Sequence, residues 1–378
     1  MSSRVVVLGA GFGGLELCTL LSEELGEDAG VTLIDKGDTF VFGFSKLDVM
    51  FGRTSLDEVQ MPYDRFVKPG VHVLRETIVA VDPEARTVTT DQGVHEADEL
   101  VIALGADYDL SATPGLAEVQ RGGEFYSVQA AARIAPQLQA FERGHALVAV
   151  AHAPFKCPPA PSECALMLND LLVERGVRDD CSITFAMALP SPVPPSPEMS
   201  EALLVEFADR GIEFLPSKRL TTVDDARGIA TFKDGDELSY DLLLAVPRHR
   251  APAFLEGMLD DEGYVPVDTA TLQTQWEGVY AVGDVATAGV PKAGVFAEGA
   301  ARVVADGIVA RRRGGESSAR HLGQGTCYIE FGEDRIAAVD IDFLSGPEKT
   351  GRFSPPSPEQ RELKDRFGRD RRARWFGL

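Results

Sequence analysis

The chain has 378 residues, of which 44% are hydrophobic and 25% charged, and its formal net charge at pH 7 is −22. This length suits two domains, the composition is that of an ordinary globular protein, and the negative charge excludes sequence-independent binding to nucleic acid. The sequence contains no apolar run of the roughly 18 residues that a membrane-spanning helix needs, and residues 1–11 lead into a strand rather than a signal peptide. We therefore expect a cytoplasmic protein.

A glycine-rich turn follows the first predicted strand, residues 4–8. The turn, GAGFGG, leads into an apolar helix and then into a second strand that ends at Asp35. Gly9, Gly11 and Gly14 form the pattern G-x-G-x-x-G, and Asp35 follows 21 residues after the last of them. In such a unit the glycines permit a tight turn, the helix N-terminus receives a pyrophosphate and the acid binds a ribose hydroxyl. The pattern predicts a dinucleotide site.

Two later strands narrow the choice of dinucleotide. One, DELVIALGA, ends at Gly105, and the other, GVYAVGDVA, ends at Gly283 and Asp284 before a helix predicted from about 293 to 313. Together with the glycine turn, this set resembles the FAD-binding domain of the pyridine nucleotide-disulfide oxidoreductase superfamily. The resemblance implies FAD as the cofactor, with Asp284 on the flavin ribitol. It also implies that the N-terminus of the following helix stabilises negative charge on the reduced flavin.

The predicted fold class is α/β, with two Rossmann-like domains and a C-terminal segment that contains strands. We expect the FAD-binding domain to be discontinuous, comprising residues 1–109 and 240–315. Residues 110–239 form the inserted second domain, which resembles an NAD-binding domain and carries a cysteine loop. Residues 316–378 follow, with the predicted strands TCYIEF and RIAAVDIDF.

The second domain has lost the features that bind a nucleotide. Its strands HALVAVA and SITFAMAL and the helix between them remain, but the connecting loop, HAPFKCPPAP, contains no glycine. The second strand runs into Leu189 and Pro190, with no acid for a ribose. Side chains and prolyl nitrogens both block the close backbone approach that a pyrophosphate needs. We expect no NAD(P)H site here.

A cysteine occupies the position of the missing phosphate loop. Cys157 follows Lys156 and precedes a helix predicted to start near Pro161, so the sequence predicts a lowered thiol pKa. His152 and Glu163 flank the loop and are candidates for moving protons. A hydrogen bond at the strand end is the alternative for His152, and a favourable first-turn position is the alternative for Glu163.

The segment PFKCPPAPSE resembles the cysteine motif of flavocytochrome c sulfide dehydrogenase and of the sulfide:quinone oxidoreductases. In GTCYIEFGEDRIAAVDIDF, Cys327 lies before a tyrosine as the second redox cysteine of that family does. The resemblance implies a Cys157–Cys327 disulfide over the flavin, opened by sulfide, a small thiol or a polysulfide. Electrons then pass through FAD to a quinone or another acceptor. Glu163 matches a family glutamate, and Lys292, just before the last predicted helix, stabilises anionic flavin or is a solvated surface group.

The chain departs from that family in two respects. It has no obvious third redox cysteine, and we expect the remaining cysteines to be structural: Cys18, Cys164 and Cys181. No cysteine pair has zinc-ligand spacing, so no metal site is expected. Its C-terminal stretch, residues 361–378, has seven basic and three acidic residues and includes the large apolar residues Leu363, Phe367, Trp375 and Phe376. This stretch can lie on the inner face of the cell membrane, dock a protein partner, or pack on its own domain or on a second subunit of a homodimer.

Two other functions stay open at this point. An NADH:quinone-type dehydrogenase uses the same fold, but the glycine-free loop opposes it. A flavin-bearing redox sensor or electron-transfer partner without turnover fits a cysteine pair and a basic tail that binds a specific protein.

Overall fold

The first parallel sheet brings the predicted nucleotide motifs to one edge. In the computed structural model, which describes residues 4–378, its strands lie in the order β21 (Val279–Ala281), β9 (Glu99–Ile102), β1 (Val5–Leu8), β2 (Val31–Asp35) and β5 (Val71–Arg75). Leu8 is in register with both Ile34 and Ile102, so neighbouring strands end level with each other. The turns that follow these strands therefore meet at the carboxyl edge of the sheet, where ligands of such sheets bind.

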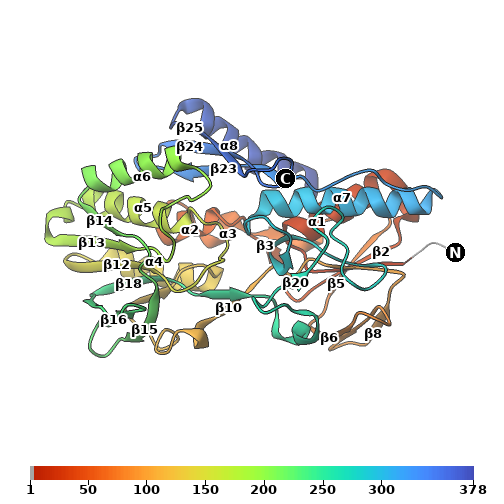
Figure 1. Cartoon of the computed structure of the whole chain (residues 1–378), viewed down its shortest axis with the longest axis horizontal. Helices are drawn as coiled ribbons and strands as arrows, with labels where there is room; N and C mark the ends of the chain where they lie inside the picture. The colour runs from red at the N-terminus through yellow and green to blue at the C-terminus, as the bar shows by residue number, and fades with distance from the viewer. Residues whose placement is uncertain (1–3) are drawn as a thin grey trace.

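Helices and a small second sheet flank these strands. Helices α1 (Phe12–Leu25) and α7 (Gly294–Arg312) pack beside each other above the sheet, and the antiparallel strands β6 (Ile78–Asp82), β7 (Thr87–Thr90) and β8 (Val94–Glu96) lie below it (Figure 1). The strands β1 and β9 are almost entirely buried and, apart from Glu99 at the start of β9, apolar, as expected for a parallel sheet covered on both faces.

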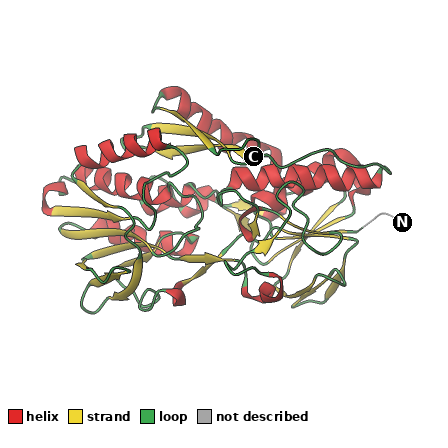
Figure 2. Ribbon diagram, viewed as in Figure 1, coloured by secondary structure: helices red, strands yellow, loops and turns green. Residues whose placement is uncertain are grey.

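The second domain repeats this arrangement. Its parallel sheet has the order β11 (Gly122–Glu124), β18 (Leu242–Val246), β12 (Gly144–Val150), β13 (Cys181–Ala186) and β14 (Ile212–Leu215). Its helices are α4 (Val128–Ala140), α5 (Ala160–Glu174) and α6 (Pro197–Asp209), and an antiparallel sheet is formed by β15 (Leu220–Asp224), β16 (Ile229–Phe232) and β17 (Glu237–Ser239). Figure 2 shows the two domains side by side, each with helices over a sheet.

The C-terminal segment lies across both domains. Strands β23 (Gln324–Glu330), β24 (Ile336–Asp342) and β25 (Thr350–Ser354) form an antiparallel sheet, and α8 (Pro358–Arg371) follows, ending in a π-helical turn, Arg372–Phe376. In Figure 1 this blue segment covers the junction of the two domains. Strand β23 packs on α7 of the first domain and on α5 of the second.

Short elements connect the larger ones. Strand β10 (Asp107–Asp109) pairs with β19 (Arg248–Arg250), so the two chain segments that cross between the domains hold each other. The other short strands and α-helices are β3 (Thr39–Phe40), β4 (Met61–Pro62), β20 (Val265–Pro266), β22 (Ala286–Thr287), α2 (Ser45–Met50) and α3 (Leu56–Val59). Short 3₁₀ helices span Gly26–Ala29, Tyr63–Arg65, Leu110–Ala112, Arg178–Asp180, Ala253–Met258 and Gly283–Val285.

One domain boundary differs from its predicted position. We expected the chain to return to the first domain at residue 240, but β18 (Leu242–Val246) pairs with β12 in the second sheet. The run LLLAV is apolar throughout, and a buried strand of either parallel sheet has that pattern, so the sequence could not assign it. The second domain therefore includes residues up to Val246.

Within residues 4–378, no helix is both long and apolar enough to cross a bilayer.

Candidate active site

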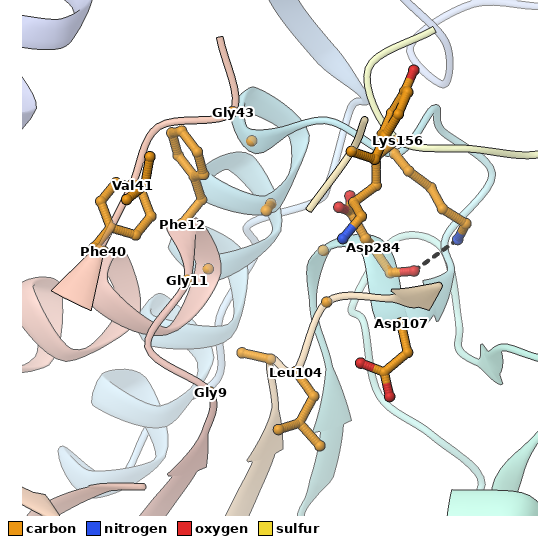
Figure 3. A pocket seen from close by; sticks show the side chains of 18 of the residues that line it. Gly9, Gly11, Phe12, Phe40, Val41, Gly43, Leu104, Asp107, Lys156 and Asp284 are labelled. Atoms are coloured by element: carbon orange, nitrogen blue, oxygen red, sulfur yellow. Dashed lines mark hydrogen bonds between the residues drawn. The ribbon is translucent and has the colours of Figure 1, made fainter. Parts of the chain in front are cut away.

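A cavity of about 420 Å³ lies where the carboxyl edge of the first sheet faces the second domain. The predicted residues that line it include members of all three strand-end motifs and of the cysteine loop: Gly9, Gly11, Asp35, Gly105, Gly283, Asp284, Lys156, Cys157, Glu163 and Lys292. Figure 3 shows Gly9 and Gly11 on one side of the cavity and Lys156 and Asp284 on the other. One cavity thus joins the two sets of residues that the sequence analysis treated separately.

The glycine turn leaves space for a ligand. Gly9 has φ of +97°, and a Cβ there would lie 2.6 Å from the carbonyl oxygen of Ala103, so no larger residue fits without strain. Gly14 lets α1 pack on the turn, because its Cβ would lie 1.9 Å from the oxygen of Gly9. Gly11, by contrast, has no heavy atom within 4 Å of a built Cβ and lines the cavity. Its missing side chain keeps a cradle open.

Both helices at this edge present free N-termini to the cavity. Within the described residues, no side chain caps the backbone N–H groups of α1 or α7, and no acidic residue lies in the first turn of either helix. Gly13 of α1 and Ala297 of α7 line the cavity. Two uncapped helix N-termini supply hydrogen-bond donors and positive potential, which suit a pyrophosphate and an anionic ring system.

Asp35 both shapes the turn and remains available to a ligand. Its carboxylate accepts hydrogen bonds from Ala10 N and Gly37 N, each 2.7 Å long, and it lines the cavity. Carboxylate oxygens can accept further hydrogen bonds, so the ribose role predicted for Asp35 is compatible with this geometry.

The opposite side of the cavity carries a positive cluster. Lys292 is buried, donates hydrogen bonds to the carbonyl oxygens of Asp284 (2.8 Å) and Ala286 (3.3 Å), and lies over the ring of Tyr264. Burial lowers its pKa to about 8. The alternative of a solvated surface lysine is therefore excluded. Lys156 donates to Ala106 O and also lines the cavity.

A backbone hydrogen bond joins the cysteine loop to the segment just before α7. The Cys157 amide donates to Lys292 O at 2.8 Å, and the Cys157 carbonyl accepts from Ala160 N at 2.9 Å and from the Tyr126 hydroxyl at 3.4 Å. Cys157 has φ of +46°, a left-handed conformation that is rare for residues other than glycine. Strained backbone of this kind occurs at functional sites, where the surroundings hold it in place.

The environment of Cys157 raises its pKa, opposite to the sequence-based expectation. Burial is the main cause, and the nearby Glu163 and Cys327 add to it. The sequence argument relied on Lys156 and on the helix end, but the Lys156 ammonium turns to Ala106 O and to the ring of Tyr108. The thiol is therefore protonated at neutral pH and needs a base.

Glu163 is placed to be that base. It lies in the first turn of α5, is buried, lines the cavity, and accepts a hydrogen bond from Glu330 N at 2.9 Å. Burial raises its pKa to about 7. A carboxyl group with that pKa is half ionised near neutral pH, which suits general acid–base catalysis.

Cys327 lies on β23 and packs against the same apolar cluster as Cys157. Burial raises the pKa of Cys327 to about 12. The Cys327 thiol is also close enough to raise the pKa of Cys157. Both cysteines are free thiols in the structure, and Cys327 does not line the cavity. The Cys157–Cys327 disulfide therefore stays a prediction.

Other predicted residues lie outside the cavity. Cys18 and Cys164 are fully buried in the two cores, and Cys181 begins β13, as expected for structural residues. His152 does not line the cavity, and burial lowers its pKa. Gly14 contributes to the turn rather than to the lining.

Sequence reasoning missed two residues at the cysteine end. Tyr126 and Lys46 line the cavity, and Lys46 Nζ donates to Tyr126 O at 2.7 Å. Lys46 lies at the start of α2, and Tyr126 lies in the segment between β11 and α4. Neither segment carries a recognisable motif. The tight packing of α2 on α4 brings them together, and no local pattern reports that contact.

The basic C-terminal stretch packs on its own first domain. Trp375 and Phe376 are buried, and the Trp375 ring contacts Phe12 and Phe40 at centroid distances of 5.7 and 5.6 Å. Arg374 Nη1 lies 2.6 Å from Glu16 Oε2. Of the alternatives that the sequence left open, the structure agrees with packing on the chain's own domain.

The first domain is a discontinuous Rossmann domain that brings a glycine turn, two uncapped helix ends and three strand-end motifs to one cavity. These features define a dinucleotide-binding protein of the two-domain flavoprotein class. The sequence pattern of the pyridine nucleotide-disulphide oxidoreductase family matches residues 3–150 and 161–305. The chain belongs to this family and is an FAD-dependent oxidoreductase.

Two curated relatives differ in how much of the chain they match. The sulfide-quinone reductase of Aquifex aeolicus is 25% identical over 361 residues, which cover 88% of this chain and 82% of the relative. A type II NADH:quinone oxidoreductase of Staphylococcus epidermidis is 35% identical, but over 104 residues, which cover 27% of this chain and 26% of the relative.

The fold agrees with these relatives. The X-ray structure of the Aquifex aeolicus sulfide:quinone oxidoreductase superimposes with a TM-score of 0.85 at 22% identity, covering 97% of this chain and 90% of that one. The NDH2 structure from Plasmodium falciparum gives a TM-score of 0.71 at 14% identity, covering 100% of this chain and 99% of that one.

Proposed function

We propose that the protein oxidises sulfide, or a related anionic sulfur nucleophile, through Cys157 and Cys327 and passes the electrons through FAD to a quinone. The observation that carries this proposal is the shared cavity: Cys157 and Glu163 line one end of it, and the glycine turn lines the other. The similarity to a sulfide-quinone reductase over most of both chains supports the same donor and acceptor.

FAD fits the residues present, and each predicted ligand has a separate role. Gly9 and Gly11 with the N-terminus of α1 hold the pyrophosphate, Gly14 lets α1 pack on that turn, and Asp35 holds the adenosine ribose. Gly105, Gly283 and Asp284 hold the ribitol side. When bound, FAD supplies a two-electron acceptor beside the sulfur site. Lys292 and the N-terminus of α7 stabilise negative charge at the ring.

The sulfur step proceeds from the oxidised cysteine pair. Hydrosulfide attacks one sulfur of the Cys157–Cys327 disulfide, so that the disulfide bond breaks and a new sulfur–sulfur bond forms to the substrate. The other cysteine leaves as a thiolate with the electron pair of the broken bond. Glu163 takes the proton of the added sulfur. The substrate sulfur thereby enters a persulfide, and two electrons become available beside the cavity.

The acceptor and the location are part of the same proposal. The two curated relatives are a sulfide-quinone reductase and a type II NADH:quinone oxidoreductase, and this supports a quinone as the acceptor here. We expect a cytoplasmic protein that meets its quinone at the inner face of the cell membrane.

An anaerobic titration of the purified yellow protein tests the donor. We expect sulfide to bleach the flavin absorbance rapidly, with a transient long-wavelength band from a thiolate beside the flavin, and NADH to have no effect. Bleaching by NADH alone contradicts the proposal and assigns the NADH:quinone activity instead. If sulfide, NADH and polysulfide all leave the flavin oxidised and the protein binds a specific protein partner, the result favours a flavin redox sensor without turnover.

A further inference from the structure

Behind Glu163 lie two further carboxylates that carry no sequence motif, the buried Glu330 and the partly exposed Asp48. Glu330 is the last residue of β23, three residues after Cys327, and its backbone N–H donates to Glu163 Oε1 at 2.9 Å. Asp48 belongs to α2, and its carboxylate interacts electrostatically with Glu163. Glu163 lines the cavity, whereas Glu330 and Asp48 do not. The three carboxyl groups therefore lead from the cavity into the protein.

Two basic side chains hold this group together. Arg53 Nη1 lies 3.1 Å from Glu330 Oε2 and 3.9 Å from Asp48 Oδ1, and Lys364 Nζ of α8 lies 3.9 Å from Glu330 Oε2. Lys364 is also the cation that most favours the charged form of Glu163. The C-terminal helix thus contributes directly to the electrostatics of the sulfur site.

This group of carboxyl and basic side chains reaches the protein surface at Asp334. Asp334 is three-quarters exposed and lies 3.6 Å from Arg53 and 3.3 Å from Arg361. Counting every charged group of the cluster, three cations face four carboxyl groups, so one negative charge is left over. The remaining titratable neighbours of Glu163 are neutral: the thiols of Cys157, Cys164 and Cys327 and the hydroxyl of Tyr126.

The excess of carboxyl groups favours one bound proton shared by the cluster. Glu330 Oε1 is buried and has no hydrogen-bond partner among residues 4–378, so this oxygen has room for a proton or a water molecule. Burial raises the pKa of Glu163 to about 7, and it also raises the pKa values of Glu330 and Asp48.

We propose that Glu330 and Asp48 carry the proton that Glu163 removes at the sulfur site from the cavity to solvent. The proposal rests on the proposed function, which releases a proton in the cavity. The O–H bond of Glu163 breaks as Glu330 gains the proton. The O–H bond of Glu330 then breaks as the proton passes beside Arg53 to Asp48, whose side chain is 29% exposed and releases it to water. No electrons move in this relay. Arg53 remains protonated and positions the carboxyl groups.

Glu330→Gln tests the relay, because glutamine keeps the size of the side chain and leaves the backbone N–H to Glu163 intact. Glu298→Gln is the matched control: Glu298 is an equally buried glutamate, paired with Arg371, outside the cavity. Two measurements are needed on the FAD-loaded proteins. One follows proton release with an indicator dye during a single reduction by sulfide. The other follows protonated carboxyl groups by infrared difference spectroscopy as the pH is raised, without any sulfide.

In the wild type and Glu298→Gln, we expect proton release to keep pace with flavin bleaching. In Glu330→Gln we expect proton release to lag by about 10²-fold, the lower end of the range of proton-transfer effects. We expect an infrared carboxyl signal that titrates near pH 7 in the wild type and the control, and that shifts or disappears in Glu330→Gln. Unchanged release and an unchanged infrared titration in Glu330→Gln overturn the relay.

The two experiments separate the relay from the proposed function. If sulfide fails to bleach the wild-type flavin, the proposed function fails, and the infrared titration still decides whether the carboxyl groups share a proton. If sulfide bleaches the flavin and the infrared signal does not depend on Glu330, the function stands and the relay is wrong.

Discussion

At the scale of single residues, Cys157 illustrates how surroundings change a chemical expectation. Its neighbours in sequence, a lysine and a helix start, favour a thiolate, but burial and Glu163 raise its pKa. A protonated thiol is a poor nucleophile, so the reduced protein is protected from stray alkylation or oxidation. In the proposed disulfide form, a cysteine sulfur is the electrophile, so attack by sulfide does not need a thiolate on Cys157.

The cysteine pair makes a direct chemical prediction. After mild oxidation, peptide mapping without reductant should recover a Cys157–Cys327 cross-link, because both thiols pack against one cluster. Cys164 and Cys181 serve as internal controls and should be recovered as free thiols. Recovery of Cys157 in another disulfide, or free after complete oxidation of Cys327, contradicts the pairing.

Glu163 sets the pH dependence of flavin reduction by sulfide. Its pKa, raised by burial to about 7, means that the proton-accepting carboxylate form increases as the pH rises through 7 and is lost below it. Glu163→Gln should remove this dependence. At each pH the same fraction of the sulfide is hydrosulfide for both proteins. The ratio of the reduction rate of the wild type to that of Glu163→Gln therefore reports the ionisation of Glu163 alone. We expect the ratio to rise about tenfold between about pH 6 and 8, which is the change in the ionised fraction of a group with a pKa of about 7, and a constant ratio argues against the role.

The same shift predicts the effect of Glu163 on stability. The folded-state pKa lies above the ordinary value of 4.5, so between pH 4.5 and about 7 the folded protein holds a proton that the unfolded chain has lost. The free energy of unfolding should therefore fall across this range. In Glu163→Gln that fall should be smaller when urea unfolding is measured at several pH values; an identical pH dependence in both proteins contradicts the shift.

At the scale of elements, the glycine turn was the most predictable part of the protein. Gly9 and Gly14 are required by the geometry of the turn, Gly11 leaves space for a ligand, and a short sequence pattern records all three. The strand-end residues Gly105, Asp284 and Asp35 were predictable for the same reason. By contrast, Tyr126, Lys46 and Glu330 reach the site through packing between distant elements, which leaves no local pattern.

Two glycines of the turn should respond differently to alanine. Gly9→Ala forces a side chain into a positive-φ position and towards the oxygen of Ala103, so we expect loss of both stability and FAD. Gly11→Ala meets no protein atom, so the fold should keep its Tm in the absence of FAD while FAD binds more weakly. Thermal unfolding with and without FAD separates the two effects. Unchanged FAD affinity in Gly11→Ala contradicts the cradle.

The secondary structure of the second domain and of the C-terminal segment was predicted in part. The sequence located the strands β12, β13, β23 and β24 and the helix α5, because each is a long run of one pattern. It did not assign β18 to a sheet and did not identify β25. Short or uniformly buried strands carry no periodicity that distinguishes one sheet from another.

At the scale of the whole molecule, the C-terminal segment joins the two domains and completes the site. Trp375 packs against Phe12, the first residue of α1. Trp375 Nε1 donates a hydrogen bond to the buried Glu16 at 3.1 Å. Lys364 of the same segment acts on Glu163. Packing of this segment is therefore part of the FAD site and of the sulfur site.

Removing the Trp375 side chain should destabilise the molecule strongly. Trp375→Ala empties a fully buried position, and substitutions of that kind cost about 3–5 kcal/mol of unfolding free energy. Chemical denaturation measures the loss. Leu378→Ala, at a half-exposed end of the same segment, should leave the stability within about 0.5 kcal/mol. Equal effects of the two substitutions contradict the anchoring role of Trp375.

The central claim is that a sulfur nucleophile reduces the flavin through Cys157. The most direct test is anaerobic rapid mixing of the FAD-loaded protein with sulfide, comparing the wild type with Cys157→Ser and with Cys181→Ser as the control. We predict rapid loss of flavin absorbance in the wild type and in Cys181→Ser, and no loss in Cys157→Ser even though that variant keeps its FAD. Undiminished reduction of the flavin in Cys157→Ser would contradict the claim.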